Sequence, residues 1–344
     1  MKVLVTGNLG YIGTVLTPYL EARGHAVRGL DVGYFEDCIL GEVSGLADQL
    51  HRDIRDVELI DLNGVEGVVH LAGLSNDPLG EFDAALTEDI NLGGTLRLAE
   101  LARRAKVRRF VYASSQSMYG ISGTDEELDE DDSPKKPLTA YARSKWEAEL
   151  GLMAGRCDGF EVTAMRPSTV FGSSARLRCD IVFNNLVASA YTSGAIEVKS
   201  DGTPRRPAIH VLDVCSAFAV GLEADAGMVD GRAFNVGIQD GNFTVRELAD
   251  TAGEVVPGSR VVFTGEHGAD SRTYTVGFSR ILQELAGLYQ PSWGLLAGGR
   301  DLCRLFDRVG FDASTFRGST CNRLQRLEEL ASAGRLDDDL RLVG

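Results

Sequence analysis

A tyrosine and a lysine four residues apart could form a proton-transfer pair. Tyr141 and Lys145 bound the segment Tyr-Ala-Arg-Ser-Lys, and on a helix this spacing puts both side chains on one face. A neighbouring ammonium stabilises a phenolate, which lowers the pKa of the tyrosine towards the range useful for acid/base catalysis. Taken alone, the motif is equally compatible with an exposed helical pair, so its meaning depends on the rest of the sequence.

Two serines lie upstream of this pair. Ser114 and Ser115 end an apolar segment at residues 109–114 that has the composition of a strand. Doubly wound folds bind their ligands beyond the carboxyl ends of the strands. We therefore expect a serine hydroxyl at the ligand-binding edge of a sheet.

A glycine pattern near the start of the sequence predicts a dinucleotide site. Gly7, Gly10 and Gly13 follow the β-branched run at residues 2–6 and open a helical pattern, so backbone amides and a helix N-terminus would face a diphosphate. Asp31 ends the next extended segment, where a carboxylate binds the adenosine ribose and repels the 2′-phosphate of NADP. This context favours an NAD site over an ordinary glycine-rich turn.

These motifs need a sheet that brings the ends of several strands together. Short apolar runs typical of strands alternate with stretches of helical apolar spacing. The expected strands lie at residues 2–6, 26–31, 67–71, 109–114 and 161–165, and the expected helices lie after Gly13, around residues 92–102 and at residues 139–153. The alternation predicts an α/β fold, namely a Rossmann-type doubly wound parallel sheet.

The regular alternation loosens after about residue 171, which predicts a smaller C-terminal substrate-binding lobe. Residues 1–170 are expected to form the NAD-binding Rossmann domain, with residues 207–237 contributing its last elements. Residues 171–206 and 238–344 are expected to form the lobe.

Two further segments have a distinctive composition. The tail at residues 323–342 is rich in leucine, glutamate and arginine, which predicts an amphipathic cap. The acidic run at residues 125–132 predicts a solvated loop.

Composition excludes several classes of protein. The 344 residues carry a net charge of -15, which would repel nucleic acid. Six scattered cysteines without Cys-x-x-Cys spacing fit neither a zinc ribbon nor a disulfide scaffold, so reduced thiols and no metal site are expected. The chain opens directly on a strand-like run and has no stretch as long as a membrane span. We therefore expect a soluble, cytoplasmic protein.

The motifs together resemble the extended short-chain dehydrogenase/reductases, and among them the NAD-dependent epimerase/dehydratase family that modifies nucleotide sugars. The resemblance runs in the family's order from residue 6 to about residue 237, and the last hundred residues match only loosely. The matching segments are Thr6 to Gly13, Asp31, Asp53 to Asp56, His70 to Gly73, Asn91 with Gly94 and Thr95, Ser114 and Ser115 with Tyr119 and Gly120, Tyr141 to Lys145, Arg166 and Pro167, Arg206 to His210 with Asp213, Asn235 to Gly237, and a stretch around Asp270, Arg272 and Tyr274.

The resemblance implies catalytic roles for three residues. Tyr141 would be the acid/base at the sugar hydroxyl, and Lys145 would bind the nicotinamide ribose and tune the phenol. Ser115 would hydrogen-bond the same sugar oxygen. The family's homodimers form through two helices, which correspond here to residues 91–102 and 141–153.

The resemblance also implies two sets of binding residues. The NAD contacts would be Gly7, Asn8, Gly10, Tyr11, Ile12, Gly13, Asp31, Asp53, Ile54, Leu71, Ala72, Gly73, Asn91, Ser114, Tyr141, Lys145, Arg166 and Ser168. The contacts to a nucleotide-diphosphate sugar would be Ser75, Ser115, Gln116, Asn184, Arg206 and Arg272. Forked hydrogen bonds make arginine suitable for a diphosphate, although ordinary surface charge is the alternative for both arginines.

The residues after the serine bear on the reaction. Sugar 4,6-dehydratases of the family carry an Asp-Glu pair there, and sugar-acid decarboxylases carry a glutamate. This chain has Gln116 and Ser117, and neither an amide nor an alcohol titrates near neutral pH. The absence of acidic residues at these two positions argues against elimination and decarboxylation.

Two simpler reactions remain as hypotheses, together with one hypothesis in which the protein is not an enzyme. A 4-epimerase oxidises the sugar transiently and returns the hydride to its other face, whereas a 4-keto-sugar reductase delivers a hydride and a proton once from NAD(P)H. Asp31 favours NAD and hence the epimerase, because dedicated reductases often use NADPH. A non-catalytic NAD-binding sensor is the third possibility, although such relatives usually lack the tyrosine and lysine.

Overall fold

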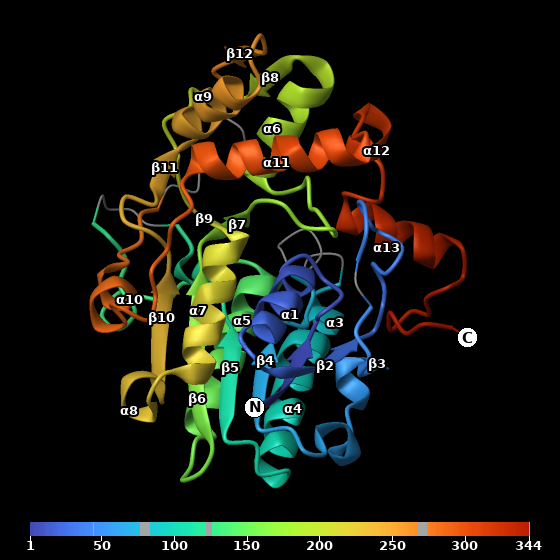
Figure 1. Cartoon of the computed structure of the whole chain (residues 1–344), viewed down its shortest axis with the longest axis vertical. Coiled ribbons are helices and arrows are strands. Elements are labelled where there is room, and N and C mark those ends of the chain that lie inside the picture. Colours follow the sequence, from blue (N-terminus) through green and yellow to red (C-terminus); the bar gives the residue numbers. More distant parts are fainter. Residues whose placement is uncertain (44, 76–82, 122–125, 267–273, 344) are drawn as a thin grey trace.

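A parallel sheet of seven strands forms the centre of the computed structural model, which describes residues 1–43, 45–75, 83–121, 126–266 and 274–343. The strand order is β10-β6-β5-β4-β1-β2-β3, and every neighbouring pair is parallel (Figure 1). The strands are β1 (Lys2–Thr6), β2 (Ala26–Asp31), β3 (Gln49–His51), β4 (Gly67–His70), β5 (Arg109–Ala113), β6 (Glu161–Pro167) and β10 (Arg232–Val236). The order reverses between β1 and β4, which is where doubly wound sheets bind ligands. The predicted Rossmann-type fold is confirmed.

Helices cover both faces of this sheet because successive strand side chains point to opposite faces. Val3 and Val5 of β1 pack with α1 (Gly13–Ala22) and α7 (Val211–Glu223). Leu4, between them, packs on the other face with α4 (Gly94–Arg104) and α5 (Ala140–Ala154). The predicted helices at residues 92–102 and 139–153 are therefore present, the first of them preceded by the π-helical turn η3 (Asp89–Gly93).

A second group of elements lies above the sheet in Figure 1 and has its own apolar core. Its helices are α6 (Val182–Ser193), α9 (Val245–Val255), α11 (Leu295–Val309) and α12 (Ala313–Arg317). Its two small sheets have the orders β11-β9-β7 and β12-β8. The strands are β7 (Thr169–Phe171), β8 (Ala195–Val198), β9 (Arg205–His210), β11 (Asn242–Thr244) and β12 (Arg260–Phe263). Short helices complete the fold, namely α3 (Ala84–Glu88), α8 (Ala226–Val229) and α10 (Ser279–Glu284), with single 3-10 turns η1 (Ile54–Asp56), η2 (Leu59–Leu62) and η4 (Gln116–Tyr119).

The C-terminal segment returns from this upper group to the edge of the central sheet. Helix α13 (Arg323–Ser332) and the residues after it, which we call the C-terminal strap (residues 323–343), run beside β2 and β3 in Figure 1. Four strap leucines are buried in the same apolar core as Leu30 of β2, namely Leu327, Leu330, Leu336 and Leu340. The predicted amphipathic cap is thus confirmed, and its apolar side covers the Rossmann core.

The prediction of a solvated loop for the acidic run is wrong at two of its described residues, 126–132: Leu128 and Glu130 are buried. Glu130 is only 6% exposed, and its carboxylate accepts a hydrogen bond of 2.8 Å from the Asn235 backbone amide. Its neighbours Asp131 and Asp132 are exposed, as expected. The acid pairs with β10, which lies a hundred residues away in sequence, so local composition could not indicate its burial.

No helix in the described part of the chain combines the length and apolarity needed to cross a membrane. All six cysteines have free thiols, and four of them are buried, namely Cys38, Cys179, Cys215 and Cys321.

Candidate active site

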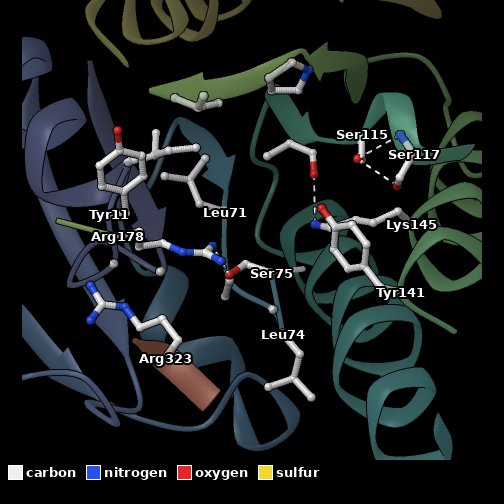
Figure 2. Close-up of a pocket in the computed structure, with 18 of the residues that line it drawn as sticks. Tyr11, Leu71, Leu74, Ser75, Ser115, Ser117, Tyr141, Lys145, Arg178 and Arg323 are labelled. Carbon is white, nitrogen blue, oxygen red and sulfur yellow. Dashed lines mark hydrogen bonds between the residues drawn. The ribbon is translucent and has the colours of Figure 1, made fainter. Parts of the chain in front are cut away.

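A cavity of about 710 Å³ lies at the carboxyl ends of the central strands (Figure 2). Its volume is in the range of sites for small organic ligands and cofactors. The sequence-predicted residues that line it are Gly7, Gly10, Tyr11, Ile12, Gly13, Asp31, Asp53, Ile54, Leu71, Ala72, Gly73, Ser75, Ser114, Ser115, Gln116, Tyr141, Lys145, Ser168 and Arg206. The structure therefore brings most of the predicted cofactor and substrate residues to one cavity.

The glycine turn between β1 and α1 leaves no room for side chains. Gly7 has φ of +72°, and a Cβ there would lie 2.8 Å from the Ala72 backbone nitrogen. A Cβ on Gly13 would lie 2.2 Å from the Gly7 carbonyl oxygen. No side chain among the described residues caps the start of α1, and the residues that lead into it, Gly10 to Gly13, line the cavity. This cradle suits the diphosphate of a dinucleotide.

Asp31 lies at the end of β2, on the wall of the same cavity. Its carboxylate accepts hydrogen bonds from the Gly33 amide at 2.8 Å and the Leu9 amide at 3.1 Å. Burial raises the pKa of Asp31, and these two amides oppose the rise. The carboxylate is thus held in place to accept ribose hydroxyls, and it would repel a 2′-phosphate.

A buried hydrogen-bond chain supports the loop that follows β4. The His70 ring lies 2.6 Å from Thr6 Oγ1 and 2.8 Å from Thr95 Oγ1, and burial lowers its pKa to about 3, so the imidazole is neutral. Asn91 accepts from the Leu74 amide at 2.8 Å and donates to the Leu74 carbonyl. Asn91, predicted as an NAD contact, therefore lies behind the loop and not on the cavity wall.

Helix α5 presents the proton-transfer pair. Thr139 caps the helix by accepting from the Ala142 amide, which sets the first turn that carries Tyr141. Lys145 is 5% exposed, and its Nζ donates to the Ala113 carbonyl at 2.9 Å. Burial lowers the pKa of Lys145 to about 8. Figure 2 shows Tyr141, Lys145 and Ser115 on one wall of the cavity, so a phenol, a hydroxyl and a poorly solvated ammonium border one space.

The serine segment forms the turn η4 after β5. Ser115 Oγ accepts from the Ser117 amide at 3.2 Å and lies 2.9 Å from Ser117 Oγ. Gln116 Nε2 donates to the Arg166 carbonyl at 2.9 Å. Gln116 Oε1 is buried and has no hydrogen-bond partner among the described residues. An unsatisfied buried acceptor on a cavity wall is available to a ligand donor.

Besides Asn91, three predicted contact residues lie behind the cavity wall instead of on it. Asn8 donates to Gln49 Oε1 at 2.6 Å. Arg166, predicted to bind the cofactor, forms a buried ion pair with Glu149. Asn184, predicted to bind substrate, accepts from the Gly172 amide at 3.0 Å and donates to the Arg178 carbonyl. Arg166 and Asn184 hydrogen-bond the wall residues Gln116 and Arg178, and a short sequence motif cannot separate such support from direct contact. Arg272 and Asp270 lie outside the described residues.

Sequence reasoning missed two arginines on the wall opposite Tyr141, namely Arg178 and Arg323 (Figure 2). Arg178 makes a forked pair with Asp180 and donates to Ser75 Oγ at 2.9 Å. Its position in an Arg-x-Arg pattern was a usable signal. Arg323 belongs to a tail whose composition indicates only a helix, so no local pattern marks it.

Comparison with known proteins assigns the family. The model of the "NAD dependent epimerase/dehydratase family" matches residues 3–237. The chain belongs to this family. It is an enzyme whose cofactor is NAD, and the glycine turn and the Asp31 carboxylate fit that cofactor.

Several relatives bind or act on nucleotide sugars, which differ from one relative to another. A UDP-glucose 4-epimerase of Mycolicibacterium smegmatis is 31% identical over 249 residues, which cover 69% of this chain and 77% of the relative. The solved structure of MoeE5 with UDP-glucose and NAD has a TM-score of 0.74 and 27% identity, and covers 90% of this chain and 99% of that chain. DesIV, a dTDP-glucose 4,6-dehydratase of Streptomyces venezuelae, has a TM-score of 0.74 and 25% identity, with 92% and 100% covered.

We expect the buried pair behind the site to be essential for stability. Glu149 joins Arg166 at 2.5 Å and also accepts from Ser114 Oγ at 2.5 Å. Glu149→Gln leaves the buried guanidinium without its counter-charge, so the free energy of unfolding should fall by about 3–5 kcal/mol. Denaturant titration measures it, with Glu147→Gln on the exposed side of α5 as the control, expected within about 0.5 kcal/mol of wild type. Equal stability of the two variants would contradict this role.

The lowered pKa of Lys145 predicts that the stability of the fold depends on pH. The unfolded lysine has its ordinary pKa of 10.5, and the folded one about 8. Protonated Lys145 therefore destabilises the fold below pH 8, and this penalty disappears as the pH rises from 8 towards 10.5. The NAD-free wild type should gain up to about 3 kcal/mol relative to Lys145→Met over that interval.

Denaturant unfolding at pH 7 and about pH 9.5 measures the difference between the two proteins. Lys136→Met, which removes an exposed lysine, is the matched control. A difference between wild type and Lys145→Met that does not change with pH would show that the lysine is not desolvated.

Proposed function

We propose that this enzyme is a nucleotide-sugar epimerase that inverts C4 through a transient 4-keto sugar. One observation carries the proposal: Tyr141, Lys145 and Ser115 border the same cavity as the glycine turn, while Gln116 and Ser117 stand where elimination would need acids. Relatives named UDP-glucose 4-epimerase support it.

The roles of the chain's residues follow from their placement. Tyr141 takes the proton of the C4 hydroxyl, and the adjacent ammonium of Lys145 stabilises the phenolate that does so. Ser115 donates to the same sugar oxygen. NAD, which the glycine turn and Asp31 would hold, would supply the hydride acceptor and donor for C4. After the 4-keto sugar turns over in the cavity, Tyr141 gives its proton back to the oxygen on the other face.

The carboxylates that line the cavity do not favour elimination. Asp31 and Asp53 lie at the end that suits adenosine. Burial would raise the pKa of Asp180, but Arg178 outweighs this effect and lowers it. An ionised carboxylate cannot protonate a departing C6 hydroxyl. A 4,6-dehydratase or decarboxylase is therefore less well supported than an epimerase.

The substrate is proposed to lie between the central sheet and the upper group of elements. Ser75, Ser115, Gln116 and Arg206 line the cavity and are the proposed contacts to the sugar nucleotide. Arg206 would place a guanidinium at its diphosphate. We accordingly propose residues 1–170 with 207–237 as the NAD-binding domain, and residues 171–206 with 238–344 as the substrate-binding lobe.

The proposed assembly is a homodimer in the cytoplasm. Leu96 of α4 and Leu150 of α5 are 37% and 49% exposed, and burial of such side chains against a second copy would be favourable. The free thiols suit a reducing compartment.

A nucleotide-sugar panel tests the reaction. The purified enzyme is incubated without added reductant, and products are separated by chromatography and identified by proton NMR. We expect at least one sugar to be converted to its C4 epimer with no net consumption of cofactor. Turnover of 4-keto substrates alone, with stoichiometric loss of reduced cofactor, would identify a reductase. Unchanged sugars with bound NAD would identify a sensor.

Replacing the phenol tests the acid/base assignment. Tyr141→Phe keeps the ring and removes only the oxygen, so we expect turnover to fall by about 10²- to 10⁴-fold. The affinity for NAD should stay close to wild type because the ring still packs at the wall. Steady-state kinetics and calorimetry measure the two quantities, and retained turnover would mean that another group moves the proton.

A further inference from the structure

Arg323 is a buried cation on the wall of the cofactor cavity. It begins helix α13 at the start of the C-terminal strap, is 2% exposed, and lines the same cavity as Gly7 and Gly13. More than three hundred residues separate it from the glycine turn in sequence. Only the return of the strap to the sheet edge brings the two together.

The charge of Arg323 has no carboxylate partner within the part of the chain that the structure describes. Among the described residues its guanidinium donates to backbone carbonyls, namely those of Thr320 at 3.1 Å, Arg176 at 2.7 Å and Leu177 at 3.4 Å. The carboxylate of Asp180 acts on it electrostatically, but that carboxylate is paired with Arg178. Burial lowers its pKa. A buried charge is costly unless an opposite charge compensates it, so this position is suited to an anion.

The neighbours of Arg323 locate it at the adenosine side of the cavity. Its guanidinium lies 4.9 Å from the centre of the Phe35 ring, and Phe35 lines the cavity four residues after Asp31. Arg176 donates to the carbonyls of Phe35 and Glu36 and adds a second guanidinium near Asp31. Figure 2 shows Arg323 on the wall opposite Tyr141 and Lys145.

The strap is anchored to the segment that follows Asp31 in the chain. Arg326 pairs with Asp37 at 2.8 Å, and Arg341 pairs with Asp56. The Tyr34 hydroxyl donates to the Leu340 carbonyl. Together with the four buried leucines of the strap, these contacts hold Arg323 in place.

We propose that Arg323 binds the diphosphate of NAD and that the C-terminal strap thereby retains the cofactor. The diphosphate carries the negative charge of NAD, and its glycine cradle borders the same cavity as the uncompensated guanidinium. The inference concerns cofactor binding and does not depend on which sugar reaction the enzyme performs.

The test compares three proteins freed of cofactor, namely wild type, Arg323→Met and Arg335→Met, the last removing an exposed strap arginine. Calorimetry measures the affinity for NAD and for adenosine, which has no phosphate. For Arg323→Met we expect NAD affinity to fall about 10- to 100-fold with adenosine affinity unchanged. Thermal unfolding of the ligand-free proteins measures the contribution of Arg323 to stability separately, because Arg323→Met removes both a buried charge and its hydrogen bonds to three carbonyls. Arg335→Met should behave as wild type in each measurement.

Three results would overturn the proposal. NAD affinity within twofold of wild type would show that Arg323 does not bind the diphosphate. Equal losses for NAD and adenosine would show that the residue only supports the strap. Unchanged NAD affinity with weakened binding of uridine diphosphate would assign the guanidinium to the substrate. Arg323→Lys, which keeps the charge, should recover part of the NAD affinity.

Discussion

The hydrogen bond from the buried Lys145 ammonium to the Ala113 carbonyl connects the two elements on which the site depends. It fixes the fourth residue after Tyr141 to the last residue of β5, immediately before Ser114 and Ser115. The tyrosine of α5 and the serine turn after β5 therefore share one wall. Behind them, Glu149 of α5 contacts both Ser114 and Arg166 of β6, so the helix is tied to two neighbouring strands.

Several positively charged side chains line the cavity, although the net charge of the chain is -15. Lys145 and Arg323 are buried on its walls, and burial lowers the pKa of both. A poorly solvated cation in a low-dielectric cleft attracts anions strongly. A dinucleotide and a sugar nucleotide each carry a diphosphate, so the same field suits cofactor and proposed substrate. The net charge sums over the whole chain and gives no indication of this local arrangement.

The sequence was sufficient for the sheet, the glycine turn and the pair on α5, because each depends on local spacing. It was insufficient where the decisive partner lies far away in the chain. Arg166 and Asn184 have the right residue types for ligand contacts, but Glu149 and Gly172 engage them behind the wall. Glu130 is buried against partners distant in sequence, the Asn235 amide of β10 and Arg280, and Arg323 reaches the cavity only through the path of the strap.

The central claim is that Tyr141 and the nicotinamide side of the cavity act together on one sugar carbon. A substrate carrying deuterium at C4 tests it most directly, with the product examined by proton NMR and mass spectrometry. A hydride that leaves and returns within the closed site should give a C4 epimer that retains the deuterium. Loss of the label to solvent would indicate removal of C4 hydrogen as a proton and would contradict the account.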